Sequence, residues 1–344
     1  MRIGIAFDLL PADRAAVGGP DDRFEEFDKP ETVAAIADVI RGEGHDVSLL
    51  GDGPEFLRKV LDDPPDFVFN IAEGQGVGRC REARVPAVLE MLGIPYSGSD
   101  PLTLSAALDK DVAKRLVSAC GVNVPEGILL SNTMPMDEAL DEAARLGRRV
   151  GYPLILKPAY EGSSKGIRGR CLADDHFEAE ALYRRLREDY EQPVLVERFI
   201  AGMEITVGVI GNGDEARSLG MLAILPKEPT DRFVYSLDVK RDWLRRVDYR
   251  LLQFSGDTLD GIATQALSAH RALGCRDVAR IDFRLKGEAL YFIEANPLPG
   301  LAPGTSDLVI LAEKYGLSHG DLIRRILNTA LERVGLLPAG AVAS

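Results

Sequence analysis

Short apolar runs alternate with amphipathic stretches over the first hundred residues of the chain. Side chains repeat every two residues along a strand and about every 3.6 along a helix, so each spacing predicts one kind of element. The apolar runs predict buried strands at 2–7, 46–50 and 66–71. Helical spacing covers 31–44 and 82–92, whereas 10–29 is rich in glycine, proline and aspartate and is predicted to be a loop. Strands that alternate with helices indicate a parallel α/β sheet.

The remainder of the chain mixes the two spacings. Helices are predicted at 104–120, 135–146, 177–189 and 259–273, and most of 307–334 also has helical spacing. Strands are predicted at 122–130, 152–158, 193–200, 203–210 and 218–225, the last two paired with each other. A glycine-rich turn within 163–172 leads into one more strand, and 336–344 is predicted to be a loose tail.

The stretch 280–300, RIDFRLKGEALYFIEANPLPG, predicts a β-hairpin with a polar face. Arg280, Asp282, Glu294 and Asn296 are expected to converge on one place in two otherwise apolar strands. Carboxylate and amide oxygens are ligands that Mg²⁺ takes together with substrate phosphates, and the arginine adds a fixed cation. The alternative is a ladder of surface salt bridges. The rigid Pro-Leu-Pro-Gly turn that follows favours a built site.

Two further stretches suggest contacts with a nucleotide. In LILKPAYEGSSKGIRG, residues 154–169, Lys157 ends an apolar strand and a glycine-serine loop follows, whose backbone N–H groups suit phosphate oxygens. No GxxxxGK[ST] motif occurs, and such a loop taken alone is often only a turn. In 194–208, Glu197 and Glu204 flank an apolar hinge that could sandwich an adenine; a strand connection with solvated acids is the alternative.

The remaining candidates carry weaker signals. Lys110 in SALDK and Lys240 in SLDVKRDW are single lysines, which acquire meaning only as part of a set. The stretch 70–79, NIAEGQGVGR, has glycines spaced GxGxG, so the dinucleotide fingerprint GxGxxG fails. A tight turn after a strand nevertheless remains there, at the edge where α/β proteins bind ligands.

Composition narrows the classes of partner. The formal net charge is −13, which argues against non-specific binding to nucleic acid or anionic membranes. The four cysteines are scattered and form no CxxC pair, as expected for reduced thiols of a cytoplasmic protein. The apolar run after Met1 is too short for a signal-peptide core, and no stretch approaches a membrane span.

Taken together, these stretches resemble the ATP-grasp superfamily, and within it the D-alanine–D-alanine ligase group. The resemblance runs from the first strand to about residue 330 and is strongest at ALDK (107–110), LKPAYEGSSKG (156–166), VERFIAGMEITVG (196–208) and the hairpin. It implies an α/β (α+β) fold with an N-terminal parallel-sheet domain at 1–106. A central lid domain is expected at 107–201, a C-terminal catalytic domain at 202–335 and a flexible tail at 336–344.

The resemblance also implies a role for each matching residue. ATP would be bound by Lys110, Lys157, Glu161, Ser163, Ser164, Gly166, Glu197, Phe199, Ile200, Glu204 and Lys240. Two magnesium ions, with manganese as a possible substitute, would be held by Asp282, Glu294 and Asn296. Arg280, Lys240 and Ser164 would be catalytic. A carboxylate would attack the γ-phosphate of ATP, and an amine would then displace phosphate from the acyl phosphate while two loops exclude water.

The match is poorer at the residues that would bind the amino acids. Candidates for that role are Glu31, Glu73, Glu82, Arg79, Arg81, Gly300, Thr305 and Ser306. The two arginines suggest the hypothesis that the acceptor carries an extra carboxylate. The product could be D-alanyl-D-alanine, or the substrate another amino acid or small carboxylate of secondary metabolism. A catalytically idle ATP-binding protein is the third interpretation, and a homodimer is expected from the resemblance.

Overall fold

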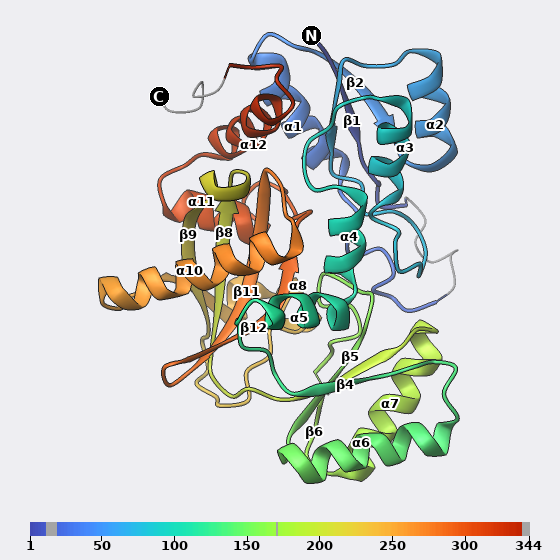
Figure 1. Ribbon diagram of the computed structural model, residues 1–344, viewed down its shortest axis with the longest axis vertical. Helices are drawn as coiled ribbons and strands as arrows, with labels where there is room; N and C mark the ends of the chain where they lie inside the picture. The colour runs from blue at the N-terminus through green and yellow to red at the C-terminus, as the bar shows by residue number, and fades with distance from the viewer. Residues whose placement is uncertain (12–18, 170, 339–344) are drawn as a thin grey trace.

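The computed structural model describes residues 1–11, 19–169 and 171–338, which form three sheets (Figure 1). The N-terminal sheet has the order β2-β1-β3, the middle sheet β4-β7-β5-β6 and the largest sheet β10-β9-β8-β11-β12. The predicted loop 10–29 and the predicted tail 336–344 lie partly outside the described residues. Among the described helices, none is long and apolar enough to cross a membrane.

The N-terminal sheet is parallel, as the alternation of strands and helices predicted. Its strands are β1 (Arg2–Ala6), β2 (Asp46–Gly51) and β3 (Phe67–Asn70), and its helices are α1 (Pro30–Gly42), α2 (Gly53–Asp62) and α3 (Arg84–Leu92). Helix α2 was not predicted. It is short and buries only Phe56 and Val60, one turn apart, although Phe56, Leu57, Val60 and Leu61 recur at helical spacing in the sequence.

The helix predicted at 104–120 is two helices, α4 (Pro101–Leu108) and α5 (Lys110–Ala119). Asp109 breaks the helix with an extended backbone, and its side chain accepts hydrogen bonds from the N–H groups of Asp111 and Val112. An aspartate can satisfy the free N–H groups that begin a helix, and here this capping outweighs continued helical spacing. The break sets Lys110 at the first turn of α5, where it faces the other sheets.

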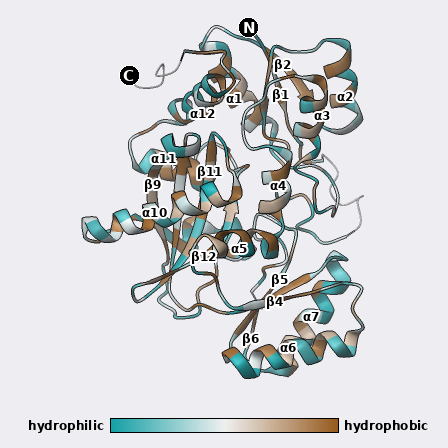
Figure 2. Ribbon diagram, viewed as in Figure 1, coloured by the Kyte–Doolittle hydropathy of each residue, from teal (hydrophilic) through white to brown (hydrophobic). Residues whose placement is uncertain are grey.

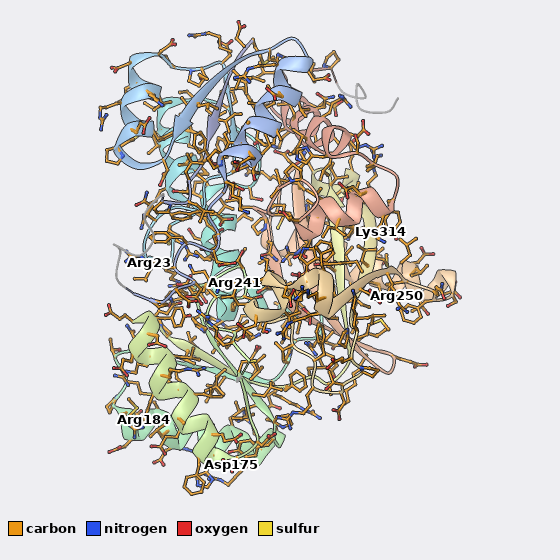
Figure 3. The ribbon with its side chains drawn as sticks, turned by 180° about the vertical axis from the view of Figure 1, so that it is seen from behind. Arg23, Asp175, Arg184, Arg241, Arg250 and Lys314 are labelled. Atoms are coloured by element: carbon orange, nitrogen blue, oxygen red, sulfur yellow. The ribbon has the colours of Figure 1, made fainter. Side chains whose placement is uncertain are left out.

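The middle sheet has a core of its own and forms one end of the molecule (Figures 1 and 3). Its strands are β4 (Gly127–Leu130), β5 (Leu154–Pro158), β6 (Leu172–Ala173) and β7 (Val194–Arg198). Helices α6 (Met136–Val150) and α7 (His176–Tyr190) pack against it with their apolar sides, while their outer sides are hydrophilic (Figure 2). We call this unit the lid.

The largest sheet is antiparallel and carries the predicted hairpin. Its strands are β8 (Met203–Ile210), β9 (Arg217–Pro226), β10 (Val247–Leu251), β11 (Val278–Lys286) and β12 (Ala289–Asn296). Helices α10 (Gly256–Leu273) and α11 (Asp307–Lys314) belong to different core clusters, each built on alternate strand residues, so they cover opposite faces of the sheet. The short helices α8 (Leu237–Arg241) and α9 (Trp243–Arg246) and the strand β10 were not predicted.

The N-terminal sheet and the largest sheet share one continuous core, whereas the lid does not join it. Helix α12 (His319–Arg333) packs against α1, and apolar residues of both sheets belong to the same cluster. Helix α5 packs against α10 and β12, and it contacts the lid through the ion pair of Lys114 with Glu197 on β7. We therefore propose that the lid begins after α5, later than residue 107, and that it can move as a unit.

Candidate active site

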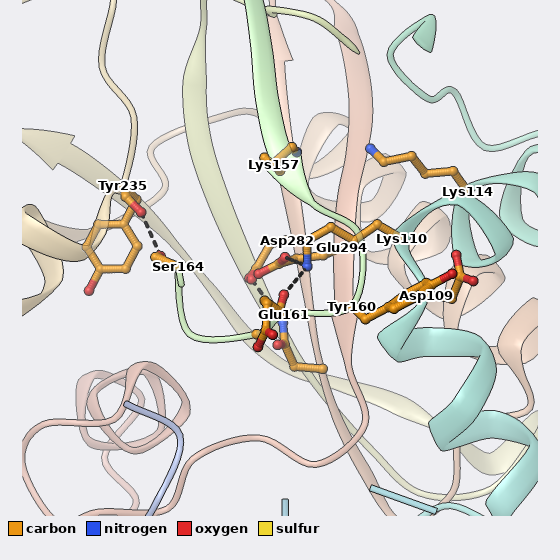
Figure 4. Close-up of polar contacts among 12 residues, drawn as sticks. Asp109, Lys110, Lys114, Lys157, Tyr160, Glu161, Ser164, Tyr235, Asp282 and Glu294 are labelled. Atoms are coloured by element: carbon orange, nitrogen blue, oxygen red, sulfur yellow. Dashed lines mark hydrogen bonds and ion pairs between the residues drawn. The ribbon is translucent and has the colours of Figure 1, made fainter. Parts of the chain in front are cut away.

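The hairpin brings its four polar residues together, as the period of two predicted. In the register of β11 and β12, Asp282 lies opposite Glu294 and Arg280 lies opposite Asn296, and a bulge follows between Asp282 and Phe283. The flanking apolar residues Ile281 and Phe283 are fully buried on the other face of the strand. In Figure 4, Asp282 and Glu294 of this face lie near Lys110 on α5 and Glu161 in the loop that follows β5.

Arg280 is held by two carboxylates. It donates three hydrogen bonds of 2.8–3.1 Å to Asp282 and one of 3.0 Å to Asp307. Asp307 also accepts hydrogen bonds from the hydroxyls of Tyr235 and Tyr249. Burial alone would lower the pKa of Arg280, but the two carboxylates outweigh it and raise that pKa well above its usual range. Arg280 therefore stays charged in a fixed position, and Asp307 is a positioning residue that the sequence patterns missed.

The oxygen donors of the hairpin fit magnesium. Asp282 and Glu294 are carboxylates facing each other, and Asn296 adds an amide that hydrogen-bonds Asp282 at 3.2 Å. Within the described residues, no group of three His, Cys, Asp or Glu side chains is arranged as a complete metal site. Magnesium ordinarily takes one or two protein carboxylates and completes its shell with phosphate oxygens and water, which matches this donor set.

Lys110 connects the hairpin to the glycine-serine loop. Its ammonium lies 3.3 Å from a carboxylate oxygen of Glu294 and donates to the backbone carbonyl of Glu161 (Figure 4). Burial alone would raise the pKa of Glu294, but the charges of Lys110, Arg280 and Lys157 outweigh it and lower the pKa to about 2. Glu294 is therefore ionised at neutral pH and available as a metal ligand.

Two buried lysines form ion pairs with Glu197. Lys157 on β5 and Lys114 on α5 lie 2.8 and 2.7 Å from its two carboxylate oxygens, and all three side chains are buried. Burial lowers the pKa of Lys114 to about 8, because Glu197 compensates only part of the desolvation. Lys114 was not predicted, since it lies on the inward face of an otherwise amphipathic helix and belongs to no recognised motif.

Glu204 and the apolar hinge are organised by Arg284. This arginine donates to Glu204 at 2.8 Å and to the carbonyls of Ile200 and Phe233, and it stacks 5.0 Å from the ring centroid of Phe199. Together with Lys157 and Glu197, these residues line a narrow cavity of about 70 Å³ between the lid and the largest sheet. Sequence reasoning identified the hinge but not the arginine that holds it.

The glycine-serine loop adopts a strained backbone. Ser163 and Ser164 both have positive φ, 49° and 59°, a conformation that costs non-glycine residues about 1–3 kcal/mol and concentrates at functional sites. The Ser163 hydroxyl accepts from Lys240 at 3.2 Å, and the Ser164 hydroxyl donates to the Tyr235 carbonyl at 2.9 Å. The glycine-serine loop therefore contacts α8, the short helix that carries Lys240. Gly166 has φ +75°, and a Cβ there would lie 2.4 Å from Pro158.

An acidic segment, residues 21–26, ties both loops to the N-terminal domain. Glu26 accepts from the Gly162 amide and pairs with Lys165, and Asp22 accepts from the Gly166 amide. Arg241 on α8, which lies near the middle of the molecule in Figure 3, pairs with Glu25. The loops are thus in a closed arrangement, fastened by carboxylates.

Arg81 joins the same cluster and is fully buried. Its guanidinium lies 2.9 Å from Glu26 and 3.4 Å from Glu161, and only 1% of the side chain is exposed. Arg79 pairs instead with Asp109 at 2.6 Å and is 52% exposed. Neither arginine lines the cavity of about 540 Å³ that adjoins the hairpin. The hypothesis that they bind an extra acceptor carboxylate therefore loses its physical basis, because both guanidiniums are already engaged within the protein.

A central cavity of about 540 Å³ adjoins the hairpin and the loops. Of the residues expected to bind amino acids, it is lined by Glu73, Glu82, Gly300, Thr305 and Ser306. Glu31 lies in the first turn of α1, exposed to solvent, and does not line it. Asp28, three residues before it in the chain, does line the cavity.

Three carboxylates of this cavity have unusual acidities. Burial raises the pKa of Glu82 and of Asp28 to about 7, and burial together with the negative charges of Glu82 and Glu26 raises that of Glu73. Glu82 and Asp28 would be partly protonated near neutral pH unless a cation joins them. This pattern is characteristic of ligand-binding sites.

The raised pKa of Glu82 predicts how stability depends on pH. Because the pKa of Glu82 in the folded protein, about 7, exceeds the ordinary glutamate value of 4.5, the folded protein binds more protons between these values and loses stability as the pH rises. We expect Glu82→Gln to leave the free energy of unfolding nearly unchanged below pH 4.5 and to raise it by roughly 1–3 kcal/mol at pH 8. Urea unfolding at both pH values measures this, with Glu288→Gln in the exposed hairpin turn as control. An equal gain at both pH values would contradict it.

The comparisons with known proteins identify the family of the chain. A family model described as the D-ala D-ala ligase C-terminus matches residues 116–328. A D-alanine–D-alanine ligase from Sinorhizobium fredii is 32% identical over 305 residues, which cover 86% of this chain and 91% of the relative. The chain belongs to the D-alanine–D-alanine ligase family. A further relative in the family, from Gluconobacter oxydans, is 32% identical over 304 residues and covers 87% of this chain and 93% of its own.

Solved structures of the family share the fold. A D-alanine–D-alanine ligase from Bacillus anthracis complexed with ATP superposes with a TM-score of 0.70 at 22% identity, covering 97% of this chain and 98% of that one. The VanG D-Ala:D-Ser ligase from Enterococcus faecalis has the same TM-score at 20% identity, with coverages of 96% and 99%. The predicted ATP-grasp fold is thereby confirmed.

Proposed function

We propose that this protein is an ATP-dependent ligase that joins a carboxylate to an amine, with the hairpin and the loops as its active site. The observation that carries the proposal is the convergence of Arg280, Asp282 and Glu294 with Lys110 beside two adjoining cavities. Membership of the D-alanine–D-alanine ligase family supports the same reaction class. The substrates are ATP and small amino acids or carboxylates.

The reaction divides between the two cavities. A substrate carboxylate attacks the γ-phosphorus of ATP, so that an acyl phosphate forms and ADP leaves. The amine of the second substrate then attacks the carbonyl carbon, loses a proton and expels phosphate. The protein supplies no nucleophile. Positioning and charge stabilisation provide the catalysis, as in other phosphoryl transfers.

The residues of each cavity suit a defined task. Lys157, Glu197 and the Phe199–Ile200 hinge would bind the adenine end, with Glu204 at the ribose. Lys110, Lys240 and the loop hydroxyls of Ser163 and Ser164 would contact phosphates, and Arg280 would stabilise charge on the attacked carbonyl. When bound, magnesium held by Asp282, Glu294 and Asn296 would neutralise phosphate charge. Gly166 and the side chain of Glu161 serve the loop itself, since both are committed to contacts within the protein.

Nucleotide entry would require the lid to open. The adenine-side cavity of about 70 Å³ is much smaller than typical ligand pockets of about 300–1,000 Å³. The lid has a separate core, so rotation about its connections would widen the gap without disturbing the shared core. Resealing over bound substrates would exclude water, which would otherwise hydrolyse an acyl phosphate.

The deciding experiment is ADP release from ATP and Mg²⁺ with D- and L-amino acids, alone and in pairs. Release that depends on amino acid, with a dipeptide found by mass spectrometry, is expected. D-alanine alone as sufficient substrate would assign the product that the relatives are named for. ATP binding without ADP release across the panel would favour a nucleotide-binding protein without catalysis.

A substitution at Asp307 tests the role proposed for Arg280. Asp307→Asn removes a charge that fixes the guanidinium but touches no proposed substrate atom, so we expect kcat to fall by up to about 10²-fold with little change in KM for ATP. Single-turnover ADP formation measures the effect. Tyr249→Phe, which removes only a hydroxyl donor to Asp307, should be much milder. Equal losses in both variants would instead indicate general damage to this region.

The family resemblance also supports two proposals about the protein in the cell. We propose that it forms a homodimer and acts in the cytoplasm. Light scattering of the purified chain tests the first, and fractionation of cells that produce it tests the second. A monomer at micromolar concentration would contradict the dimer.

A further inference from the structure

The carboxylates that line the central cavity divide into two groups. The first group is paired within the protein. It comprises Glu25 with Arg241, Glu26 with Arg81 and Lys165, Glu161 with Lys165, Glu294 with Lys110, and Asp307 with Arg280. The second group comprises Asp28, Glu73 and Glu82, whose side chains make no hydrogen bond or ion pair with any described residue.

Glu82 is the most telling member of the second group. It is only 7% exposed, and it lines the cavity. Its carboxylate forms no ion pair with a cation among the described residues. Arg81, its neighbour in the chain, forms its ion pairs with Glu26 and Glu161. Burial raises the pKa of Glu82, and the nearby charge of Arg81 offsets only part of that rise. A buried carboxylate without a partner costs several kcal/mol if it ionises, so such a group is expected to have a cationic ligand or to stay protonated.

Glu73 and Asp28 enlarge the same negative patch. Glu73 is close enough to feel the charges of Glu82 and Asp28, and all three line one cavity. The lining also includes cations: Lys110, Lys240, Arg241 and Arg280 each contact a protein group, and Lys29 is exposed to solvent. Three buried or half-buried carboxylates at this end therefore have no ion-pair partner within the described part of the chain.

We propose that one substrate of the ligase is an amino acid with a basic side chain, whose second cationic group binds among Asp28, Glu73 and Glu82. This inference rests on the proposed function for the reaction but on the cavity for the substrate class. A neutral amino acid brings one ammonium and leaves carboxylates unpaired. An acidic amino acid would add a negative charge where Arg79 and Arg81 are already engaged.

Binding of the second cation has a further signature. Because burial raises the pKa of Glu82 and Asp28 to about 7, both are partly protonated at neutral pH in the free protein. A cation beside them favours the ionised forms. Binding should therefore release protons, in an amount that decreases as the pH is raised.

The test compares each basic amino acid with a neutral one of similar shape, in both chiralities: arginine with citrulline, and lysine with norleucine. Affinity is measured by calorimetry on the full chain with Mg²⁺ and a non-hydrolysable ATP analogue, in buffers of different ionisation enthalpy. Turnover is measured separately as ADP release. We expect the basic member of at least one pair to bind at least about tenfold tighter and to release protons.

The variants Glu82→Gln and Glu73→Gln should lose most of that preference, while Glu288→Gln keeps it. Asp28→Asn provides a third variant if either glutamine variant folds poorly. Equal binding of basic and neutral partners, or binding of neither, would overturn the substrate class. Preferential binding of the basic member without ADP release would leave the substrate class standing and overturn the ligase proposal.

Discussion

Replacing Glu294 by glutamine is expected to lower ADP formation by about 10²–10³-fold. Glu294 lies opposite Asp282 in the hairpin and forms an ion pair with Lys110. Among the proposed metal ligands, it therefore contacts the largest number of charged residues. Glutamine keeps the shape of the side chain but removes the charge, which leaves Lys110 without its carboxylate. The measurement is ADP release under saturating ATP and Mg²⁺ with the best amino-acid pair from the panel.

A matched control separates this effect from general damage. Glu288→Gln makes the same chemical change in the exposed turn of the same hairpin and should leave turnover unchanged. ATP affinity without added metal should change by no more than a few-fold in Glu294→Gln, because Lys157 and Glu197 are untouched. Full activity of Glu294→Gln at low Mg²⁺ would refute its assignment as a metal ligand.

Arg81→Met is expected to destabilise the fold by about 3–5 kcal/mol. The guanidinium compensates the buried carboxylates of Glu26 and Glu161, and burial would otherwise raise the pKa of Glu26 instead of leaving it at about 2. Removing it leaves Lys165 as the only cation in contact with both carboxylates among the described residues. The free energy of urea unfolding measures the change.

Arg79→Met is the natural comparison, two residues away. Arg79 is half-exposed and forms one ion pair with Asp109, so its loss should cost no more than about 1 kcal/mol. Because Glu26 and Lys165 also fasten the glycine-serine loop, Arg81→Met should make that loop more accessible to protease. Similar unfolding energies for the two variants would contradict the buried cluster as a source of stability.

Much of the fold could be predicted because it depends on local patterns. Apolar and polar residues alternate along 280–300 and so predict the hairpin. Its register then brings Asp282 opposite Glu294. The prediction was wrong where two local preferences compete. Helical spacing runs through 104–120, but Asp109 can cap a helix, and only packing against the other elements selects the break.

The site was predicted less evenly. Most of the residues expected to bind the nucleotide lie together around the narrow cavity between the lid and the largest sheet. Three residues that hold site residues in place were not predicted: Lys114, Arg284 and Asp307. Each is an ordinary charged residue in its own segment of the sequence. A carboxylate in a motif predicts a charge to be matched, but the sequence does not say which cation matches it.

By itself, then, the sequence determined most of the longer elements, the polar face of the hairpin and the family to which the chain belongs. These follow from side-chain periodicity and from short motifs whose residues are neighbours along the chain. Tertiary structure alone decided which charges are satisfied. Arg81 forms ion pairs with Glu26 and Glu161 across separations of 55 and 80 residues, whereas Glu82, beside it in the chain, forms no ion pair with any residue that the structure describes. Charge pairing depends on distance in space, and that distance is set by how the sheets pack.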